Sequence, residues 1–172
     1  VPPLEQREVS DTIFHYGEEP ASRRIAKAIV TMRESAPLTT TSALRAAVLS
    51  AGVRGKPGHD PATRTFQALR IAVNAELEQL EVVLADGWRL LRPGGRMAVL
   101  TYHSLEDRIV KNAFRAWAAR CVCPPTKPIC DCGWTPKVRL LSSRLKRASD
   151  AEVARNPRAR SAGLRAVERL SS

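Results

Sequence analysis

The sequence predicts an α/β chain in which a helical first part is followed by a mixed part of helices and short strands. Two observations predict this order. Apolar residues recur at helical spacing from about residue 23 to residue 91. A Pro-Gly-Gly turn at 93–95 then precedes a short apolar run at 97–100, and similar runs follow at 138–141 and 163–168. With 44% hydrophobic residues among 172, the chain can bury one sizeable core or two small ones, which excludes disordered and fibrous classes.

The helical part divides into several predicted elements. Apolar spacing predicts amphipathic helices over 23–32 and 42–51, and the three Gly and one Pro of segment 52–60 predict a loop. The apolar pattern from 61 to 91 is too long for one ordinary helix. We therefore expect two helices there, sharing a buried face, with a break near Asn74.

A candidate site follows the first predicted strand. The run 97–100 is expected to form a buried parallel strand, and Ser104 to cap the next helix. Ligands of open α/β sheets bind at such strand ends. The ring of Tyr102 could stack on a base, while His103 and Asp107 could accept hydrogen bonds from an exocyclic amine. Helix capping explains Ser104 and Asp107 equally well, and a hydrolytic triad is disfavoured because these residues share one helical turn.

The charge distribution indicates an acidic partner. The formal net charge is +11; residues 1–107 hold 13 basic and 13 acidic side chains, whereas residues 108–172 hold 15 and 4. Such a basic C-terminal part is typical of a phosphate-binding surface, although a solvated face is the alternative. The candidate RNA-binding residues in it are Arg108, Lys111, Arg144, Lys146, Arg147, Arg158 and Arg160.

A second polar set lies on the predicted helix after residue 61. Arg64, Gln67 and Asn74 fall near one helical face, with Arg70 toward its edge. Two arginines and two amides can bind phosphates and base edges. A polar helix side that is simply solvated explains the same pattern.

Four cysteines form a local C-x-C…C-x-C pattern: Cys121, Cys123, Cys130 and Cys132. Four thiolates can close a tetrahedral structural zinc site, although ordinary zinc ribbons have two residues within each pair. The alternative is four reduced thiols in a loop.

No apolar run reaches the roughly 18 residues of a membrane span, and residues 1–5 lack the features of a signal peptide. We therefore expect a soluble, cytoplasmic protein without a membrane partner.

Several long segments together resemble one known family. They read YGEEPASRRIAKAIV (16–30), DPATRTFQALRIAVNAELE (60–78), LRPGGRMAVLTYHSLEDRIVK (91–111) and NPRARSAGLRAVERL (156–170). These phrases resemble the RsmH (MraW) family of bacterial methyltransferases over nearly the whole chain. The Thr101-Tyr102 pair stands where many members have Ser-Phe.

The resemblance implies an activity and an architecture. Members of this family use S-adenosylmethionine to methylate the exocyclic N4 of a cytosine in the decoding centre of 16S ribosomal RNA. Their fold is a Rossmann-like class I methyltransferase sheet with a helical insertion. Residues 1–60 would then be the helical insertion domain that recognises RNA. Residues 61–172 would be the C-terminal part of the methyltransferase domain, with the closing strands of its sheet, a cysteine-containing loop at 121–136 and a basic tail. The implied partner is 16S rRNA in the small ribosomal subunit. The resemblance leaves open whether the protein forms a homodimer.

One departure from the family pattern matters. The chain holds no G-x-G-x-x-G motif, and no strand is predicted before its first helix. It therefore resembles only the later half of such an enzyme, and we expect it to lack the cofactor site and to be inactive alone. A sheet built from 96–170 alone would leave an unpaired edge and an uncovered apolar face. The alternatives are a basic RNA-binding module without catalysis and a zinc-stabilised interaction domain.

Overall fold

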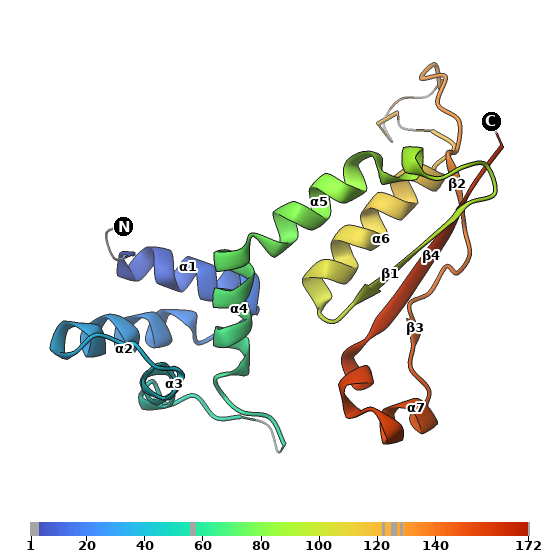
Figure 1. The fold of residues 1–172 in the computed structure, drawn as a ribbon. Coiled ribbons are helices and arrows are strands. Elements are labelled where there is room, and N and C mark those ends of the chain that lie inside the picture. Colours follow the sequence, from blue (N-terminus) through green and yellow to red (C-terminus); the bar gives the residue numbers. More distant parts are fainter. Residues whose placement is uncertain (1–3, 56–57, 122, 125–126, 128, 172) are drawn as a thin grey trace. The chain divides into compact units, whose positions relative to one another are not determined.

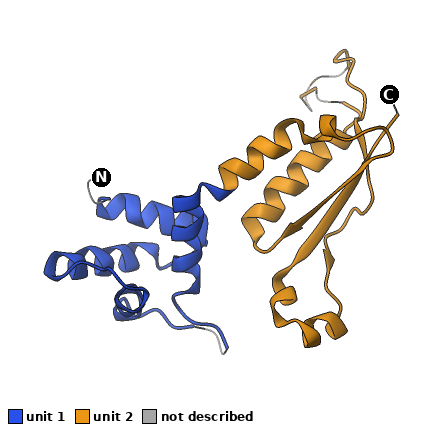
Figure 2. Cartoon of the chain, viewed as in Figure 1, with its two compact units in different colours: residues 1–76 blue, residues 77–172 orange. Residues whose placement is uncertain are grey.

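A computed structural model describes residues 4–55, 58–121, 123–124, 127 and 129–171 of the chain. It divides into two compact units, unit 1 with residues 1–76 and unit 2 with residues 77–172, which are described separately (Figure 2). The signal-peptide expectation at 1–5 and the loop expectation at 52–60 fall partly outside the described residues. Of the helices that the structure describes, none combines the length and the apolar character needed to cross a membrane.

Unit 1 is helical throughout its regular structure (Figure 1). Its helices are α1 (Gln6–Gly17), α2 (Ser22–Ser35), α3 (Thr41–Ser50) and α4 (Thr63–Asn74). The predicted helices at 23–32 and 42–51 are confirmed as α2 and α3. Thr40 precedes α3 and its hydroxyl oxygen accepts a hydrogen bond from the Ala43 N–H, which satisfies one of the free donors at the helix start.

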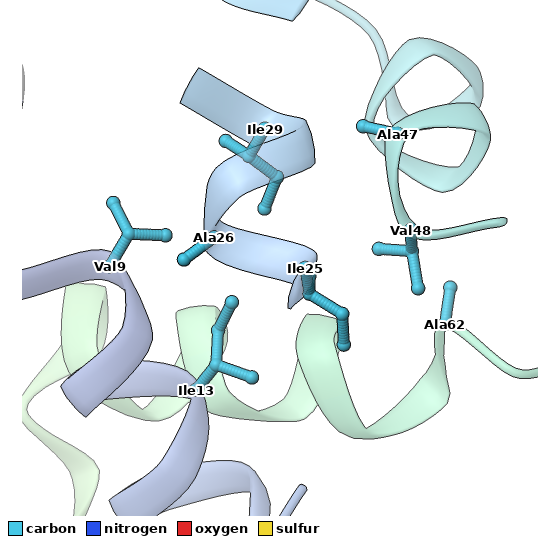
Figure 3. Close-up of a cluster of buried hydrophobic side chains, with 8 residues drawn as sticks. All are labelled: Val9, Ile13, Ile25, Ala26, Ile29, Ala47, Val48 and Ala62. Carbon is cyan, nitrogen blue, oxygen red and sulfur yellow. The ribbon is translucent and has the colours of Figure 1, made fainter. Parts of the chain in front are cut away.

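The apolar stripes of these helices meet in one core (Figure 3). Removing these side chains from water is the main stabilising contribution to the unit. The core residues are Val9 and Ile13 of α1, Ile25, Ala26 and Ile29 of α2, Ala47 and Val48 of α3, and Ala62 before α4.

Gly17 allows α1 and α4 to approach closely. It is buried, and a Cβ at this position would lie 2.6 Å from the backbone oxygen of Arg64. Because that distance is far below a normal contact, the two helices could not pack in this way with a larger residue.

The predicted break near Asn74 is confirmed. Helix α4 ends at Asn74, Ala75 takes a left-handed conformation with φ 49°, and α5 (Glu76–Asp86) begins directly after it. The boundary between the compact units falls after Glu76, because α4 packs against α1.

Unit 2 combines an antiparallel sheet with helices. Its strands are β1 (Arg96–Thr101), β2 (Val138–Leu140), β3 (Lys146–Arg147) and β4 (Gly163–Arg169); its helical elements are α5, η1 (Gly87–Leu90), α6 (Ser104–Ala118), α7 (Asp150–Arg155) and η2 (Pro157–Ser161). The strand order is β1-β4-β2, with β3 also pairing with β4, and every pair is antiparallel. The predicted strands at 138–141 and 163–168 are confirmed as β2 and β4.

The expectation of a buried parallel strand at 97–100 was wrong. Strand β1 pairs antiparallel with β4, and its side chains alternate between half-buried and exposed positions; Leu100 is 57% exposed. Helices α5 and α6 cover one face of the sheet (Figure 1), where Leu84, Phe114 and Val167 join one core. Among the described residues, no strand pairs with the other edge of β1, so the expected unpaired edge is present.

Candidate nucleic-acid interface

A pocket of about 490 Å³ lies in unit 2, where β1 ends and α6 begins. Segments distant in the sequence meet there: the β1–α6 junction, the first turns of α6, β3 and η2. Its lining residues are Thr101, Tyr102, His103, Ser104, Asp107, Arg108, Lys111, Leu145, Arg147, Arg160 and Ser161. The structure therefore brings together the three predicted base-pocket residues and four of the predicted RNA-binding residues.

The start of α6 is fixed by a reciprocal cap. His103, rather than Ser104, is the N-cap residue: its Nδ1 accepts a hydrogen bond from the Glu106 N–H at 3.3 Å. Glu106 Oε2 in return accepts from the N–H groups of Tyr102 (2.7 Å) and His103 (3.3 Å). The prediction that Ser104 caps this helix was wrong, because His103 has the extended backbone of a cap and Ser104 is already helical.

This cap also sets the charge state of Glu106. Burial raises the pKa of Glu106. The His103 side chain and the hydrogen bonds from the two backbone N–H groups lower this pKa by a larger amount, so the net shift is downward. Glu106 Oε1 lies 3.1 Å from His103 Nε2. The imidazole thus accepts from the Glu106 N–H at Nδ1, while its buried Nε2 lies against the Glu106 carboxylate without an aligned hydrogen bond among the described residues.

Asp107 is held by an arginine from β4. Arg165 Nε and Nη2 donate to the two carboxylate oxygens at 2.6 and 3.0 Å, and Arg165 itself is only 9% exposed. The pKa of Asp107 is lowered mainly by this hydrogen bonding, against the opposing effect of burial, and the charges of Lys111 and Arg147 lower it further. Asp107 therefore carries its charge at neutral pH.

The pocket has an excess of positive charge. Lys111, Arg147 and Arg160 make no ion pair within the part of the chain that the structure describes. Tyr102 is 54% exposed beside them. Cations that make no ion pair with the described residues, next to an exposed aromatic ring, are suited to a phosphate-bearing ligand with a planar base.

Comparison with known proteins connects this chain to a family. A profile of the MraW methylase family matches residues 1–170. The chain belongs to the MraW methylase family.

Three similar curated proteins share one name. The chain is 53% identical over 165 residues to "Ribosomal RNA small subunit methyltransferase H" of Thermomicrobium roseum, covering 95% of this chain and 50% of the relative. Proteins of the same name from Symbiobacterium thermophilum and Lawsonia intracellularis are 51% and 46% identical, over 98% and 96% of this chain and 54% of each relative. The chain thus spans about half the length of these relatives.

The MraW family implies the methyl donor S-adenosylmethionine, and the pocket does not fit it. This donor contains a sulfonium cation, whereas the pocket lining contributes four cationic side chains. The carboxylate of the lining, that of Asp107, is already bound by Arg165. Like charges this close repel one another, so the pocket favours anions over a sulfonium.

The four polar residues predicted on α4 lie in unit 1 and bind their own chain. Arg64 Nη1 donates to the Glu18 carbonyl at 3.1 Å, and Gln67 Nε2 donates to the Tyr16 carbonyl at 3.4 Å. These bonds satisfy carbonyls near the end of α1. Arg70 donates twice to Glu76, and Asn74 donates to the same carboxylate.

The remaining predicted RNA-binding residues lie outside the pocket lining. Arg144, Lys146 and Arg158 are exposed in the segment between β2 and β4. They belong to the same basic part of the chain, but the structure does not bring them into the cavity.

Sequence reasoning missed Arg165. Along β4 the buried positions alternate, and Arg165 lies on the same face as Gly163 and Val167. The sequence alone does not show that this face is buried, because each of the two alternating faces of 163–169 holds both apolar and charged residues. Only the structure shows that Arg165 lies on the buried face, where a charge requires a partner of opposite charge.

The cysteines are brought together at the other end of α6. Cys121, Cys123, Cys130 and Cys132 place their sulfur atoms within 4.8 Å of one another. The Cys123 N–H, which donates to the Cys121 sulfur, lowers the pKa of the Cys121 thiol, but the neighbouring thiols raise it and the net value is about 12.

Proposed function

We propose that this chain is the RNA-binding and target-base half of an S-adenosylmethionine-dependent methyltransferase that modifies the N4 amine of a cytosine in the decoding centre of 16S rRNA. The observation that carries the proposal is the pocket itself. It combines an exposed aromatic ring, an ionised carboxylate and three cations, Lys111, Arg147 and Arg160, that make no ion pair with a described residue. Membership of the MraW family and the names of the relatives support the methyl-transfer reaction.

Each pocket residue has a role that its chemistry supports. The Tyr102 ring stacks on the flipped base. Asp107 accepts a hydrogen of the exocyclic amine, because an ionised carboxylate has about four acceptor positions and Arg165 uses two of them. His103 is a positioning residue that fixes the start of α6 through Glu106.

The cations bind the backbone of the RNA. Arg147 and Arg160 come from different elements and face the same cavity as Lys111. The guanidinium group of arginine can donate two parallel hydrogen bonds to one phosphate. Such contacts position a nucleic acid without recognising its sequence. The exposed Arg144, Lys146 and Arg158 extend this basic surface beyond the pocket.

The sheet is the closing part of a Rossmann-like class I methyltransferase sheet. Strand β4 is antiparallel to both of its main neighbours, so β1 and β2 run parallel to each other on either side of it. The other strands of such a sheet would pair with the open edge of β1 and would supply the cofactor site. They would correspond to the part of the relatives that this chain does not span. Residues 1–60, extended by α4, form the helical insertion. A protein that methylates rRNA would act in the cytoplasm.

A hybrid protein tests this proposal. The chain replaces the matching segment of the Symbiobacterium thermophilum relative, and the purified hybrid is incubated with small ribosomal subunits and labelled S-adenosylmethionine. We expect label in N4-methylated cytidine of 16S rRNA, identified by nucleoside mass spectrometry. Tyr102→Ala and Asp107→Asn should reduce it strongly, whereas Arg7→Gln, an exposed change on α1, should not.

Two outcomes would contradict the proposal. Label in another nucleoside would exclude the N4 amine as the acceptor, and full activity of the Asp107→Asn hybrid would exclude the proposed role of that carboxylate. The isolated chain should show no calorimetric binding of S-adenosylmethionine; micromolar binding would mean that its residues form the cofactor site after all.

A second candidate is a basic RNA-binding module without catalysis. The observation in its favour is that the pocket cations suffice to bind phosphates whether or not a methyl donor is near. RNA binding by a hybrid that transfers no methyl group would favour this candidate.

A further inference from the structure

We propose that Cys121, Cys123, Cys130 and Cys132 form a structural site for one zinc ion, a property separate from the methyltransferase function. A Zn–S bond of about 2.3 Å in a tetrahedron places each pair of sulfurs about 3.8 Å apart. The Cys121 sulfur lies 3.3 Å from that of Cys130 and 3.7 Å from that of Cys132. The Cys130 sulfur lies 3.5 Å from that of Cys132 and 4.0 Å from that of Cys123. Four of the six sulfur pairs thus lie at 3.3–4.0 Å, near the value of a tetrahedral site, and all four atoms lie within 4.8 Å of one another.

These distances fit metal coordination better than disulfide bonding. A disulfide requires about 2.05 Å between its sulfurs, and every measured pair is well beyond that. Each sulfur also lies near more than one other, as in a shared coordination sphere, whereas disulfides would separate the set into two pairs. Four thiolates in a tetrahedron are the donor set of zinc or of an iron–sulfur centre.

The position of the cluster explains why a metal is needed there. Residues 119–137 connect α6 to β2, and the described part of this segment contains no helix or strand. Loops of this length without secondary structure are uncommon in compact domains. A metal bound to two Cys-x-Cys pairs, one on each side of the loop tip, closes the segment onto itself in place of a hydrophobic core.

Both ends of the segment are already attached to the rest of unit 2. Trp134 Nε1 donates to the Ala119 carbonyl at 3.1 Å, and the Lys137 N–H donates to the Trp117 carbonyl at 2.8 Å. Trp117 is a core residue, and β2 begins directly after Lys137. Closing the loop between these anchors therefore fixes the end of α6 against the start of β2, so the metal would stabilise the sheet core rather than the pocket.

Metal analysis of the full chain tests this inference. The protein is purified without chelators and its metal content is measured by mass spectrometry, followed by thiol titration before and after denaturation. We expect about one zinc per chain and thiols that become reactive only after denaturation. Cys121→Ser with Cys130→Ser should abolish zinc binding. Asp131→Asn is the matched control, because Asp131 lies beside Cys123 yet is not one of the four sulfur ligands, and it should keep the zinc.

A second measurement covers the case in which the cysteine variant does not fold. The unaltered chain is stripped of metal under reducing conditions and titrated with Co²⁺, for which we expect the absorption of tetrahedral thiolate coordination at one equivalent and a raised Tm with Zn²⁺. Iron in place of zinc, two disulfides, or four free thiols that take up neither Zn²⁺ nor Co²⁺ would each overturn the inference.

Discussion

The two units use their arginines differently. In unit 1, Arg64 and Arg70 donate to a carbonyl and a carboxylate of the same unit. In unit 2, Lys111, Arg147 and Arg160 surround a cavity and make no ion pair with any residue that the structure describes. Both sets are basic side chains on polar surfaces, and only their partners distinguish them. The difference teaches that a basic residue indicates nucleic-acid binding only when its donors remain available.

The units also differ in how completely they bury their apolar surface. The helices of unit 1 enclose one core (Figure 3). The sheet of unit 2 is covered on one face, and on the other Leu100 is exposed beside an edge of β1 that pairs with no described strand. An exposed, unpaired strand edge is normally protected by further structure. Unit 2 therefore has the features of a partial sheet, and unit 1 does not.

The largest expected effect comes from breaking the ion pair behind the pocket. Arg165→Leu leaves Asp107 without its partner, and losing one member of a buried pair costs about 3 kcal/mol. Hydrogen exchange should show this loss in α6 and β4 and not in unit 1. Replacing both residues by Leu should recover much of the stability, because no uncompensated charge remains. An equal loss in both variants would mean that packing, rather than charge, matters here.

The pH dependence of this pair follows from the lowered pKa of Asp107. A carboxyl group whose pKa is lowered by folding stabilises the protein above its unfolded pKa of about 3.9, and the contribution disappears as the pH falls through the lower folded value. The stability of wild type relative to the double Leu variant should therefore fall as the pH drops below about 4, and thermal unfolding of unit 2 at several pH values measures this change. A constant difference across this range would contradict the role of the charge.

Much of this fold could be predicted because it depends on local patterns. The break near Asn74 followed from the length of one apolar pattern, and strands β2 and β4 followed from short apolar runs between turn signals. The candidate pocket followed from one topological rule, that ligands bind where a strand ends and a helix begins. These features need no knowledge of distant residues.

The rest depends on contacts between distant parts of the chain. The direction of β1 is set by β4, which lies more than sixty residues later, since Thr101 pairs with Gly163. The partners of Arg64 and Gln67 are carbonyls near the end of α1, which no side-chain pattern shows. His103 rather than Ser104 is the N-cap because His103 is the last residue with an extended backbone before α6. Sequence patterns locate such a helix boundary only to within a few residues.

A third prediction concerns the close helix approach in unit 1. Gly17→Ala should destabilise unit 1 by about 2 kcal/mol, because overpacking of this kind costs 1–3 kcal/mol and the added Cβ meets the Arg64 backbone oxygen at 2.6 Å. Hydrogen exchange of α1 and α4 measures the effect. His15→Ala, at an exposed position of the same helix, should change little. Stabilisation by Gly17→Ala would mean that the gain in helix propensity outweighs the contact.

A fourth prediction sharpens the comparison of the two arginine sets. Arg147→Gln with Arg160→Gln should weaken binding of an rRNA fragment about tenfold and reduce its salt dependence by about 1.5 in log–log slope, since each phosphate contact contributes 0.7–0.9. Arg64→Gln with Arg70→Gln should leave RNA affinity nearly unchanged once folding is verified, because those donors bind the protein itself. Fluorescence anisotropy at several salt concentrations measures both. Equal weakening would remove the distinction between the units.

The smallest expected effect lies at the junction of α4 and α5. Ala75 has φ 49°, a left-handed conformation that costs a residue with a Cβ about 1 kcal/mol or more. Ala75→Gly removes this cost but gives the unfolded chain more freedom, so we expect a net gain below about 1 kcal/mol. Ala72→Gly, at an exposed position inside α4, should instead lose about 1 kcal/mol. Chemical denaturation should therefore show changes of opposite sign in the free energy of unfolding for these two Ala→Gly variants. A lower free energy of unfolding in both would mean that helix α4 continues through Ala75 in solution.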